Sequence, residues 1–287
     1  MTDEVRQALQ ILPQRLRQAV GQAPQANALE EVRLRSGAAV RIFANGKETA
    51  LPRECVTQEL LRDVLSAATE HSLYAAQGTM RQGFITLAGG HRLGLCGTAV
   101  EKDGQVTTLR DISSMNLRIA TQRFGCADRT ADYLWTHPAS SLIIGPPARG
   151  KTTLLRDLIR QISDRFLWRV CVVDERFELA CCQNGQPQLR IGAHTDVLSG
   201  VGKRLGIEML LRTMNPQWIA LDEITAEEDV EAIVRASYCG VRFLATAHAA
   251  SADELLQRPV YQKLLQAKVF VNLLTLLPSR EVRTERM

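Results

Sequence analysis

The sequence predicts an α/β chain in which a small α+β domain precedes a domain built on a doubly wound, mostly parallel sheet. Residues 140–163 run from a short apolar strand through a Gly/Pro loop into an amphipathic helix. Two more apolar runs, 169–173 and 218–221, are separated by helical segments, the order that produces parallel sheets. Residues 84–120 instead read as strands joined at a tight turn, which indicates an antiparallel hairpin.

Length and composition are those of a globular protein with about two domains. The chain has 287 residues, of which 45% are hydrophobic and 23% are charged. A segment rich in turn-forming and polar residues lies at 122–129. We therefore expect an α+β domain over residues 1–125, contributing to packing between subunits, and an α/β domain over residues 126–287.

Charge and cysteine usage restrict the class of protein. The net charge of +4 is not gathered into a basic stripe, which argues against a dedicated nucleic-acid-binding protein. Seven cysteines are scattered without paired metal-ligand spacing, which is typical of a reducing cytosol. The sequence shows no signal peptide, and its apolar stretch at 269–277 falls short of the about 20 residues that span a bilayer. We expect a cytoplasmic protein without direct membrane insertion, which reaches a membrane through partners.

The first domain alternates helical and strand patterns. Its first helix is interrupted at Pro13, and Lys102-Asp103-Gly104 provides the hairpin turn. The expected elements are helices at 3–21, strands at 29–35 and 39–44, helices at 58–71 and 72–83, and strands at 84–87, 89–100 and 106–120.

Three arginines lie in or beside this hairpin: Arg92, Arg110 and Arg118. One interpretation is that they pair with nearby surface carboxylates. The other is that one or more of them reaches the nucleotide held by a neighbouring subunit.

The loop of the second domain predicts nucleotide binding. It matches G-x-x-x-x-G-K-[ST], with a strand before it and a helix after it. Backbone N–H groups of such a loop surround phosphates, the lysine reaches the β- and γ-phosphates, and the hydroxyl binds Mg²⁺. Together with the alternation of apolar strands and helices, this predicts a P-loop NTPase of the RecA-like type that binds ATP and Mg²⁺. The expected nucleotide-binding residues are Gly145, Pro146, Pro147, Ala148, Arg149, Gly150, Lys151, Thr152 and Thr153.

Polar residues follow each of the other apolar strands of this domain. Ligands bind beyond the carboxyl ends of parallel strands, so these residues should share one site. Asp222 is expected to complete the Mg²⁺ coordination begun by Thr152, and Glu223 to take a proton from the attacking water or orient it.

The other strand ends offer rival and additional roles. Asp174 is a second candidate metal ligand, and Glu175 is a rival general base that we rank below Glu223. His248 follows the run at 243–245 and is either a γ-phosphate sensor or an ordinary hydrogen-bonded loop residue.

The rest of the second domain is expected to be helices joined by one long loop. The polar, Gly-rich residues 183–202 read as a solvated loop. Four basic residues in or beside it could instead meet a partner subunit: Arg190, His194, Lys203 and Arg204. The remaining expected elements are helices at 205–214, 226–237, 252–256 and 260–267, a strand at 269–276, and a charged tail.

Taken together, these motifs resemble the sporulation stage III AA family, which is related to the ATPases of type II and type IV secretion. The resemblance covers nearly the whole chain. In the first domain it rests on EEVRLR at 30–35, GGHRLGLCG at 89–97, LRDISS at 109–114 and NLRIA at 116–120. In the second it rests on the phosphate loop, VDER at 173–176, TDVL at 195–198, and NP at 215–216 leading into DEI at 222–224.

The resemblance implies an ATPase of the mother cell of an endospore-former, serving a secretion-like channel to the forespore. It implies a homo-hexameric ring, membrane-embedded sporulation channel proteins as partners, and first-domain arginines near the nucleotide. It also places Asp174 and Glu175 in the acidic box of secretion ATPases, Asp222 and Glu223 in their second nucleotide motif, and His248 in their histidine box.

Two other functions remain possible on the sequence. One is a nucleotide-gated scaffold that binds ATP and hydrolyses little of it. The other is a RecA-like, DNA-dependent ATPase, which the missing basic stripe disfavours.

Overall fold

The computed structural model describes residues 1–69, 80–147 and 149–287. The chain divides into two compact units. The first comprises Met1–Thr121 with Gln183–Gln188, and the second comprises Gln122–Cys182 with Leu189–Met287. The division by contacts thus falls a few residues before the boundary expected at 125/126, and it assigns part of the long loop to the first unit.

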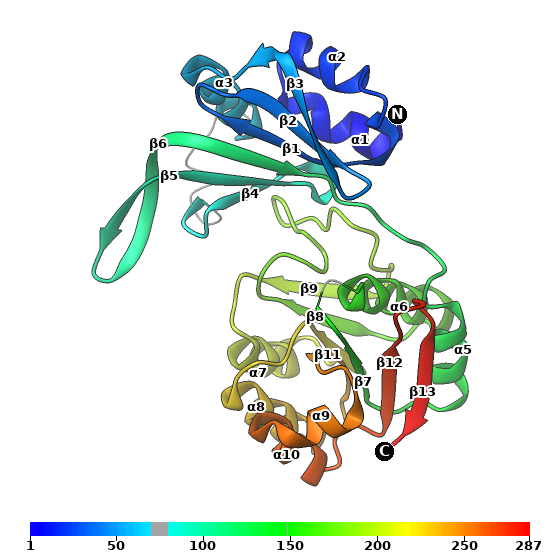
Figure 1. Cartoon of the computed structure of the whole chain (residues 1–287). Helices are drawn as coiled ribbons and strands as arrows, with labels where there is room; N and C mark the ends of the chain where they lie inside the picture. Colours follow the sequence, from blue (N-terminus) through cyan, green and yellow to red (C-terminus); the bar gives the residue numbers. More distant parts are fainter. Residues whose placement is uncertain (70–79, 148) are drawn as a thin grey trace. The chain divides into compact units, whose positions relative to one another are not determined.

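The first unit is an antiparallel sheet with helices against one face (Figure 1). Its six strands are arranged in the order β3-β2-β1-β6-β5-β4. The helices are α1 (Asp3–Ala8), α2 (Gln14–Gly21) and α3 (Gln58–Ala68). The strands are β1 (Leu29–Arg35), β2 (Ala39–Ala44), β3 (Lys47–Cys55), β4 (Phe84–Thr86), β5 (Arg92–Lys102) and β6 (Gln105–Arg118).

Alternation of buried and exposed residues gives this sheet one apolar face. Val32 and Leu34 of β1 are buried beside Leu117 of β6, and the helices cover them through residues such as Val5 and Leu61. Beyond this core, β5 and β6 continue as a two-stranded ribbon, as Figure 1 shows.

Most elements expected in the first unit are present. Helix α3 ends at Ala68, so its expected end at residue 71 is too late by a few residues. The helix expected at 72–83 falls largely outside the described residues. Strand β3 was not predicted, because it is an edge strand whose residues are mostly exposed and carry no apolar alternation.

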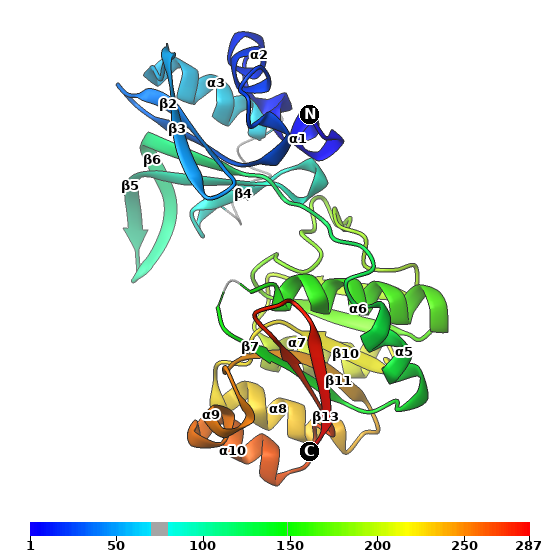
Figure 2. The same cartoon turned by 45° about the vertical axis from the view of Figure 1, so that its right-hand side comes forward.

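The second unit is a sheet with helices on both faces (Figures 1 and 2). The strand order is β13-β12-β7-β11-β10-β8-β9, and all neighbours are parallel except β12 and β13. The strands are β7 (Ser141–Gly145), β8 (Val170–Asp174), β9 (Thr195–Ser199), β10 (Trp218–Leu221), β11 (Arg242–His248), β12 (Asn272–Leu276) and β13 (Val282–Arg286). The helices are α5 (Asp128–Thr136), α6 (Lys151–Phe166), α7 (Lys203–Thr213), α8 (Glu227–Ser237), α9 (Ala252–Gln257) and α10 (Pro259–Gln266).

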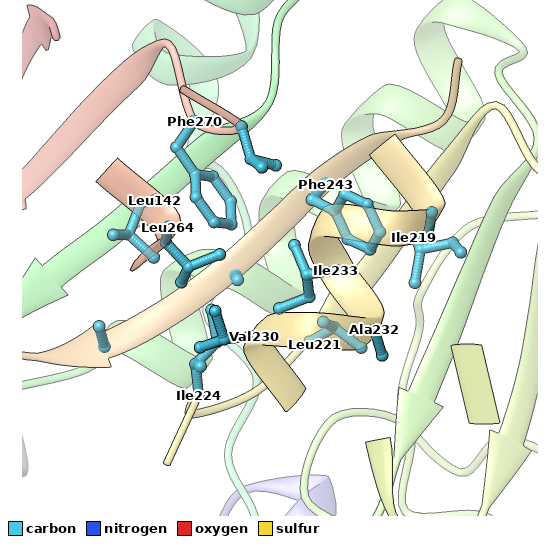
Figure 3. Packing of buried hydrophobic residues seen from close by; sticks show 14 of the residues in the cluster. Leu142, Ile219, Leu221, Ile224, Val230, Ala232, Ile233, Phe243, Leu264 and Phe270 are labelled. Carbon is cyan, nitrogen blue, oxygen red and sulfur yellow. The ribbon is translucent and has the colours of Figure 1, made fainter. Parts of the chain in front are cut away.

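Successive strand residues point to opposite faces, which divides the core into two layers. Leu142 and Phe243 belong to the layer covered by α7, α8 and α10, where Ile233 and Leu264 meet them (Figure 3). The next residue, Ile143, points to the opposite face, into the layer covered by α5 and α6. The predicted doubly wound sheet is therefore confirmed.

Two strands of this sheet were not expected. Strand β9 lies within the segment read as a loop, and β13 lies within the charged tail. Both are edge strands with few buried residues, so their side chains carry almost no hydrophobic pattern. Among the described residues, no helix is both long and apolar enough to cross a membrane.

Candidate functional site

The phosphate loop joins β7 to α6. Gly150 precedes the helix with φ of 101°, a backbone conformation that residues with a Cβ rarely adopt. Lys151 is buried, and its Nζ donates to the backbone oxygens of Gly145 (2.9 Å) and Pro146 (3.0 Å). Burial lowers the pKa of Lys151, and the negative charges of Asp222 and Glu223 oppose that shift. The lysine thus lies folded against its own loop.

The other predicted loop residues differ in exposure. Pro147 and Arg149 are exposed, and Thr153 follows Thr152 on the first turn of α6. Ala148 lies outside the described residues.

The second acidic pair, Asp222 and Glu223, lies next to this loop at the carboxyl ends of the strands. The parallel strands end at a common edge, so Asp222, which follows β10, lies beside the start of α6. The Thr152 hydroxyl donates to Asp222 Oδ2 at 2.8 Å, and the Thr246 hydroxyl donates to Asp222 Oδ1 at 2.6 Å. Hydroxyl and carboxylate oxygens are the ligands that Mg²⁺ prefers, so this donor set fits the ion.

Glu223 and His248 lie beside Lys151. His248 Nδ1 is 3.3 Å from Lys151 Nζ, and its Nε2 is 3.2 Å from Glu223 Oε1. An ammonium can only donate, so Nδ1 of a neutral imidazole accepts here and Nε2 carries the proton toward Glu223. Arg176 approaches the other oxygen of Glu223 at 3.4 Å. The Glu223 carboxylate therefore lies between the imidazole of His248 and the guanidinium of Arg176, and His248 in turn contacts Lys151 of the phosphate loop.

Asp174 has a different environment from Asp222. Its side chain is buried, and its two oxygens accept four backbone N–H groups, those of Glu178, Leu179, Ala180 and Cys181. The carboxylate thus anchors the loop that follows β8. A metal ion at this position would have to displace bonds that the loop already uses.

Glu175 is paired with a buried lysine. Lys203 Nζ donates to Glu175 Oε2, and Asp229 of α8 lies 3.9 Å from the same nitrogen. The lysine side chain is only 4% exposed. The expectation that Lys203 belongs to a solvated loop or meets a partner subunit is therefore wrong, because it begins α7 and faces the acidic residues of its own unit.

A cavity of about 210 Å³ opens beside the phosphate loop. Gly150 and Thr153 line one side, and Leu276 and Pro278 line another. Three arginines surround it: Arg123, Arg149 and Arg280. Its position next to the first turn of α6 suits the nucleoside part of a nucleotide.

The three arginines predicted to act across subunits all lie in the first unit. The Arg92 guanidinium lies 4.1 Å from the centre of the Phe84 ring. Arg118 is 3.7 Å from Glu31, and Arg110 faces Thr98 on the exposed ribbon of β5 and β6. Their approach to a neighbour's nucleotide stays a prediction.

Sequence reasoning missed several residues of this site. Thr246 has no sequence signal beyond its position directly after the apolar run at 243–245, and Arg176 appears only within the VDER string at 173–176. The cavity residues Leu276 and Arg280 come from the chain's last segment, far from the loop in sequence. The parallel order of β7, β11 and β10 would have identified Thr246, since that order places the end of β11 between the two motifs.

The comparisons agree with this architecture. The stage III sporulation protein AA of Bacillus subtilis is 37% identical over 268 residues, which cover 91% of this chain and 87% of that protein. Among solved structures, the pilus retraction motor PilT with bound ADP superimposes with a TM-score of 0.63 at 15% identity, covering 95% of this chain and 81% of PilT. The ATPase DotB of Legionella pneumophila gives a TM-score of 0.58 at 14% identity, covering 94% and 78%.

The two structural matches establish the fold, which is the P-loop fold shared with the ATPase DotB and the motor PilT. Family membership rests on sequence: the family described as sporulation stage III, protein AA, matches residues 2–283. With a relative at 37% identity over most of both chains, the chain belongs to the sporulation stage III protein AA family.

Proposed function

We propose that this chain hydrolyses ATP in the presence of Mg²⁺, as a ring-forming ATPase that serves a channel between mother cell and forespore. The observation that carries the proposal is the convergence of Lys151, Asp222 and Glu223 at one edge of the sheet. Coordination of Mg²⁺ would need the Thr152 hydroxyl and the Asp222 carboxylate close together, and these two groups are in direct contact at 2.8 Å. The family and its structural neighbours support the same reading.

Residues at this edge of the sheet are candidates for phosphate binding, metal binding and water activation, whereas the arginine of such sites would come from a neighbouring subunit. The loop N–H groups and Lys151 bind the phosphates, and Thr152 with Asp222 would hold Mg²⁺, which supplies charge neutralisation when bound. Glu223 orients the attacking water or accepts its proton. Asp174 is excluded from the metal set, because its oxygens are occupied by backbone donors.

Glu223 is a better candidate than Glu175 for the residue that activates water. The Glu175 carboxylate is neutralised by Lys203, and this pair links β8 to the first turn of α7. Glu223 instead faces His248, which also contacts Lys151. This contact gives His248 a route by which it responds to the γ-phosphate that Lys151 would bind.

The proposed assembly and location are supported by the family resemblance alone. We propose a homo-hexamer in the cytoplasm of the mother cell, held at the membrane by channel proteins of the sporulation apparatus. First-domain arginines complete the site of the neighbouring subunit. An isolated subunit would then hydrolyse ATP slowly, because a missing arginine can cost roughly 10³ to 10⁵ in rate.

The test is phosphate release as a function of protein concentration, for wild type beside Lys151→Ala and Glu223→Gln. We expect the wild-type rate per subunit to rise with concentration and both variants to be inactive, while Glu223→Gln still binds ATP. A near-zero rate at every concentration with ATP bound would identify a nucleotide-gated scaffold. Stimulation by single-stranded DNA would identify a DNA-dependent ATPase.

A further inference from the structure

A single buried hydroxyl contacts both acidic residues that follow β10. Thr246 is 1% exposed, and its Oγ1 donates to Asp222 Oδ1 at 2.6 Å and accepts the Glu223 N–H at 2.7 Å. A carboxylate can only accept and a backbone N–H can only donate, so the direction of both bonds is determined. No other donor or acceptor arrangement satisfies both partners.

The backbone of Glu223 needs this support. Its φ of 48° lies in the left-handed region, which is unfavourable for a residue with a side chain and persists only where neighbours hold it. The backbone oxygen of Thr246 accepts the next N–H, that of Ile224, at 3.0 Å. Thr246 therefore supplies acceptors to two successive residues of the turn.

The same strand also contacts the Glu223 side chain. Thr246 and His248 are two residues apart on β11, so their side chains point to the same side of the sheet. His248 Nε2 lies 3.2 Å from Glu223 Oε1, whereas Thr246 holds the Glu223 backbone. Meanwhile the opposite oxygen of Asp222 is held by Thr152 at 2.8 Å. Each Asp222 oxygen thus has one threonine partner.

We propose that Thr246 is a positioning residue of the hydrolytic site, whose hydroxyl holds the Asp222 carboxylate that would bind Mg²⁺ and holds Glu223 in its strained turn. This inference rests on the proposed function, because it assigns Thr246 a role through the two acidic residues. Thr246 would act through its bonds to Asp222 and Glu223. It would control the rate of hydrolysis and the response to Mg²⁺, without contributing to phosphate binding by the loop.

The experiment compares Thr246→Val, which keeps the shape and removes both bonds, with Thr246→Ser, which keeps the hydroxyl. The matched control is Thr275→Val. Thr275 is a buried threonine of β12 in the same sheet, and its hydroxyl has no hydrogen-bond partner among the described residues. Thermal unfolding of all three variants establishes that they are folded.

We expect kcat of Thr246→Val to fall at least about tenfold, since small misplacements of catalytic groups are costly. The KM for ATP should change less than about twofold, because the loop is intact, and the Mg²⁺ concentration at half-maximal rate should rise. Thr246→Ser should restore most of kcat, and Thr275→Val should behave as wild type.

Binding of a fluorescent ATP analogue, with and without Mg²⁺, provides a second readout that needs no turnover. In Thr246→Val the gain in affinity from Mg²⁺ should shrink, while binding without Mg²⁺ is unchanged. A folded Thr246→Val variant with normal kcat and normal Mg²⁺ response would overturn the inference, as would a serine variant as defective as the valine one. A wild type that does not turn over ATP would count against the proposed function, and the binding comparison would still decide the role of Thr246.

Discussion

At the scale of residues, two acidic pairs in this chain have the same sequence and different surroundings. Asp174 ends β8 and Asp222 follows β10, yet Asp174 accepts four backbone N–H groups and Asp222 accepts two threonine hydroxyls. The backbone N–H groups that bind Asp174 cannot be displaced without unfolding their loop. The Thr152 hydroxyl beside Asp222 can instead bind the same metal ion as the carboxylate. Residue type alone does not separate these cases.

His91 shows a second kind of difference between sequence and environment. It is 1% exposed, and its Nδ1 accepts the Ala120 N–H at 3.0 Å. Burial lowers the pKa of His91 to about 4, and the charge of Glu4 opposes this only in part. The imidazole is therefore neutral in the folded first unit at physiological pH.

This burial predicts a pH dependence of stability. The folded pKa lies below the unfolded value of about 6.5, so the unfolded chain binds the proton more readily. Stability is then fully present above pH 6.5 and is lost as the pH falls toward 4. Between pH 7 and pH 5 we expect the free energy of unfolding to fall by about 2 kcal/mol from this group.

Denaturant unfolding of wild type and His91→Asn at both pH values tests this. Asparagine offers an acceptor near the position of Nδ1 and does not titrate, so the loss between pH 7 and pH 5 should shrink. An equal loss in both proteins would show that other groups govern the acid response.

At the scale of elements, the close packing of helix α7 against the sheet brings Lys203 to an acidic residue. Helix α7 brings Lys203 to Glu175, and it can do so because Gly206 on its next turn has no side chain. A Cβ built on Gly206 would lie 2.6 Å from Val173 Cγ1 of β8. The helix must therefore move away if any side chain is added here.

Gly206→Ala should destabilise the second unit by about 1–3 kcal/mol, as expected for overpacking of a core. Gly202→Ala is the matched control, because a Cβ there meets nothing within 4 Å and its φ of −60° is ordinary. Thermal unfolding of the two variants measures the difference. Equal melting temperatures would mean that α7 is not held tightly against β8.

At the scale of the whole molecule, the two units have separate cores, and the nucleotide motif lies in the second one. The three arginines of the first unit are predicted to act on the site of another subunit. In a ring, each interface joins different surfaces of neighbouring subunits, so a site can combine residues from two chains.

Mixing experiments test this arrangement. Suppose Arg118→Ala and Lys151→Ala are each inactive alone. In an equal mixture, roughly a quarter of the interfaces would pair an intact loop with an intact arginine, and hydrolysis should return to about that level. Arg92→Ala and Arg110→Ala are tested in the same way. As a control, Lys151→Ala mixed with Thr152→Ala should stay inactive, and an arginine variant that is never rescued does not act across subunits.

The sequence by itself determined the strand–loop–helix of the phosphate site, the buried strands of the parallel sheet and the acidic residues at their ends. These features depend on hydrophobic periodicity and on a loop pattern, both of which are local in the chain. The tertiary structure decided that backbone N–H groups occupy the Asp174 carboxylate and that Lys203 is buried. It also decided that Thr246 contacts both Asp222 and Glu223. The contacts of Lys203 and Thr246 join residues more than 20 positions apart, for which local patterns carry no signal. The bonds of Asp174 reach only four to seven positions along the chain, but they depend on how the backbone turns after β8. Edge strands β9 and β13 also came only from the structure, because an exposed edge needs no apolar alternation.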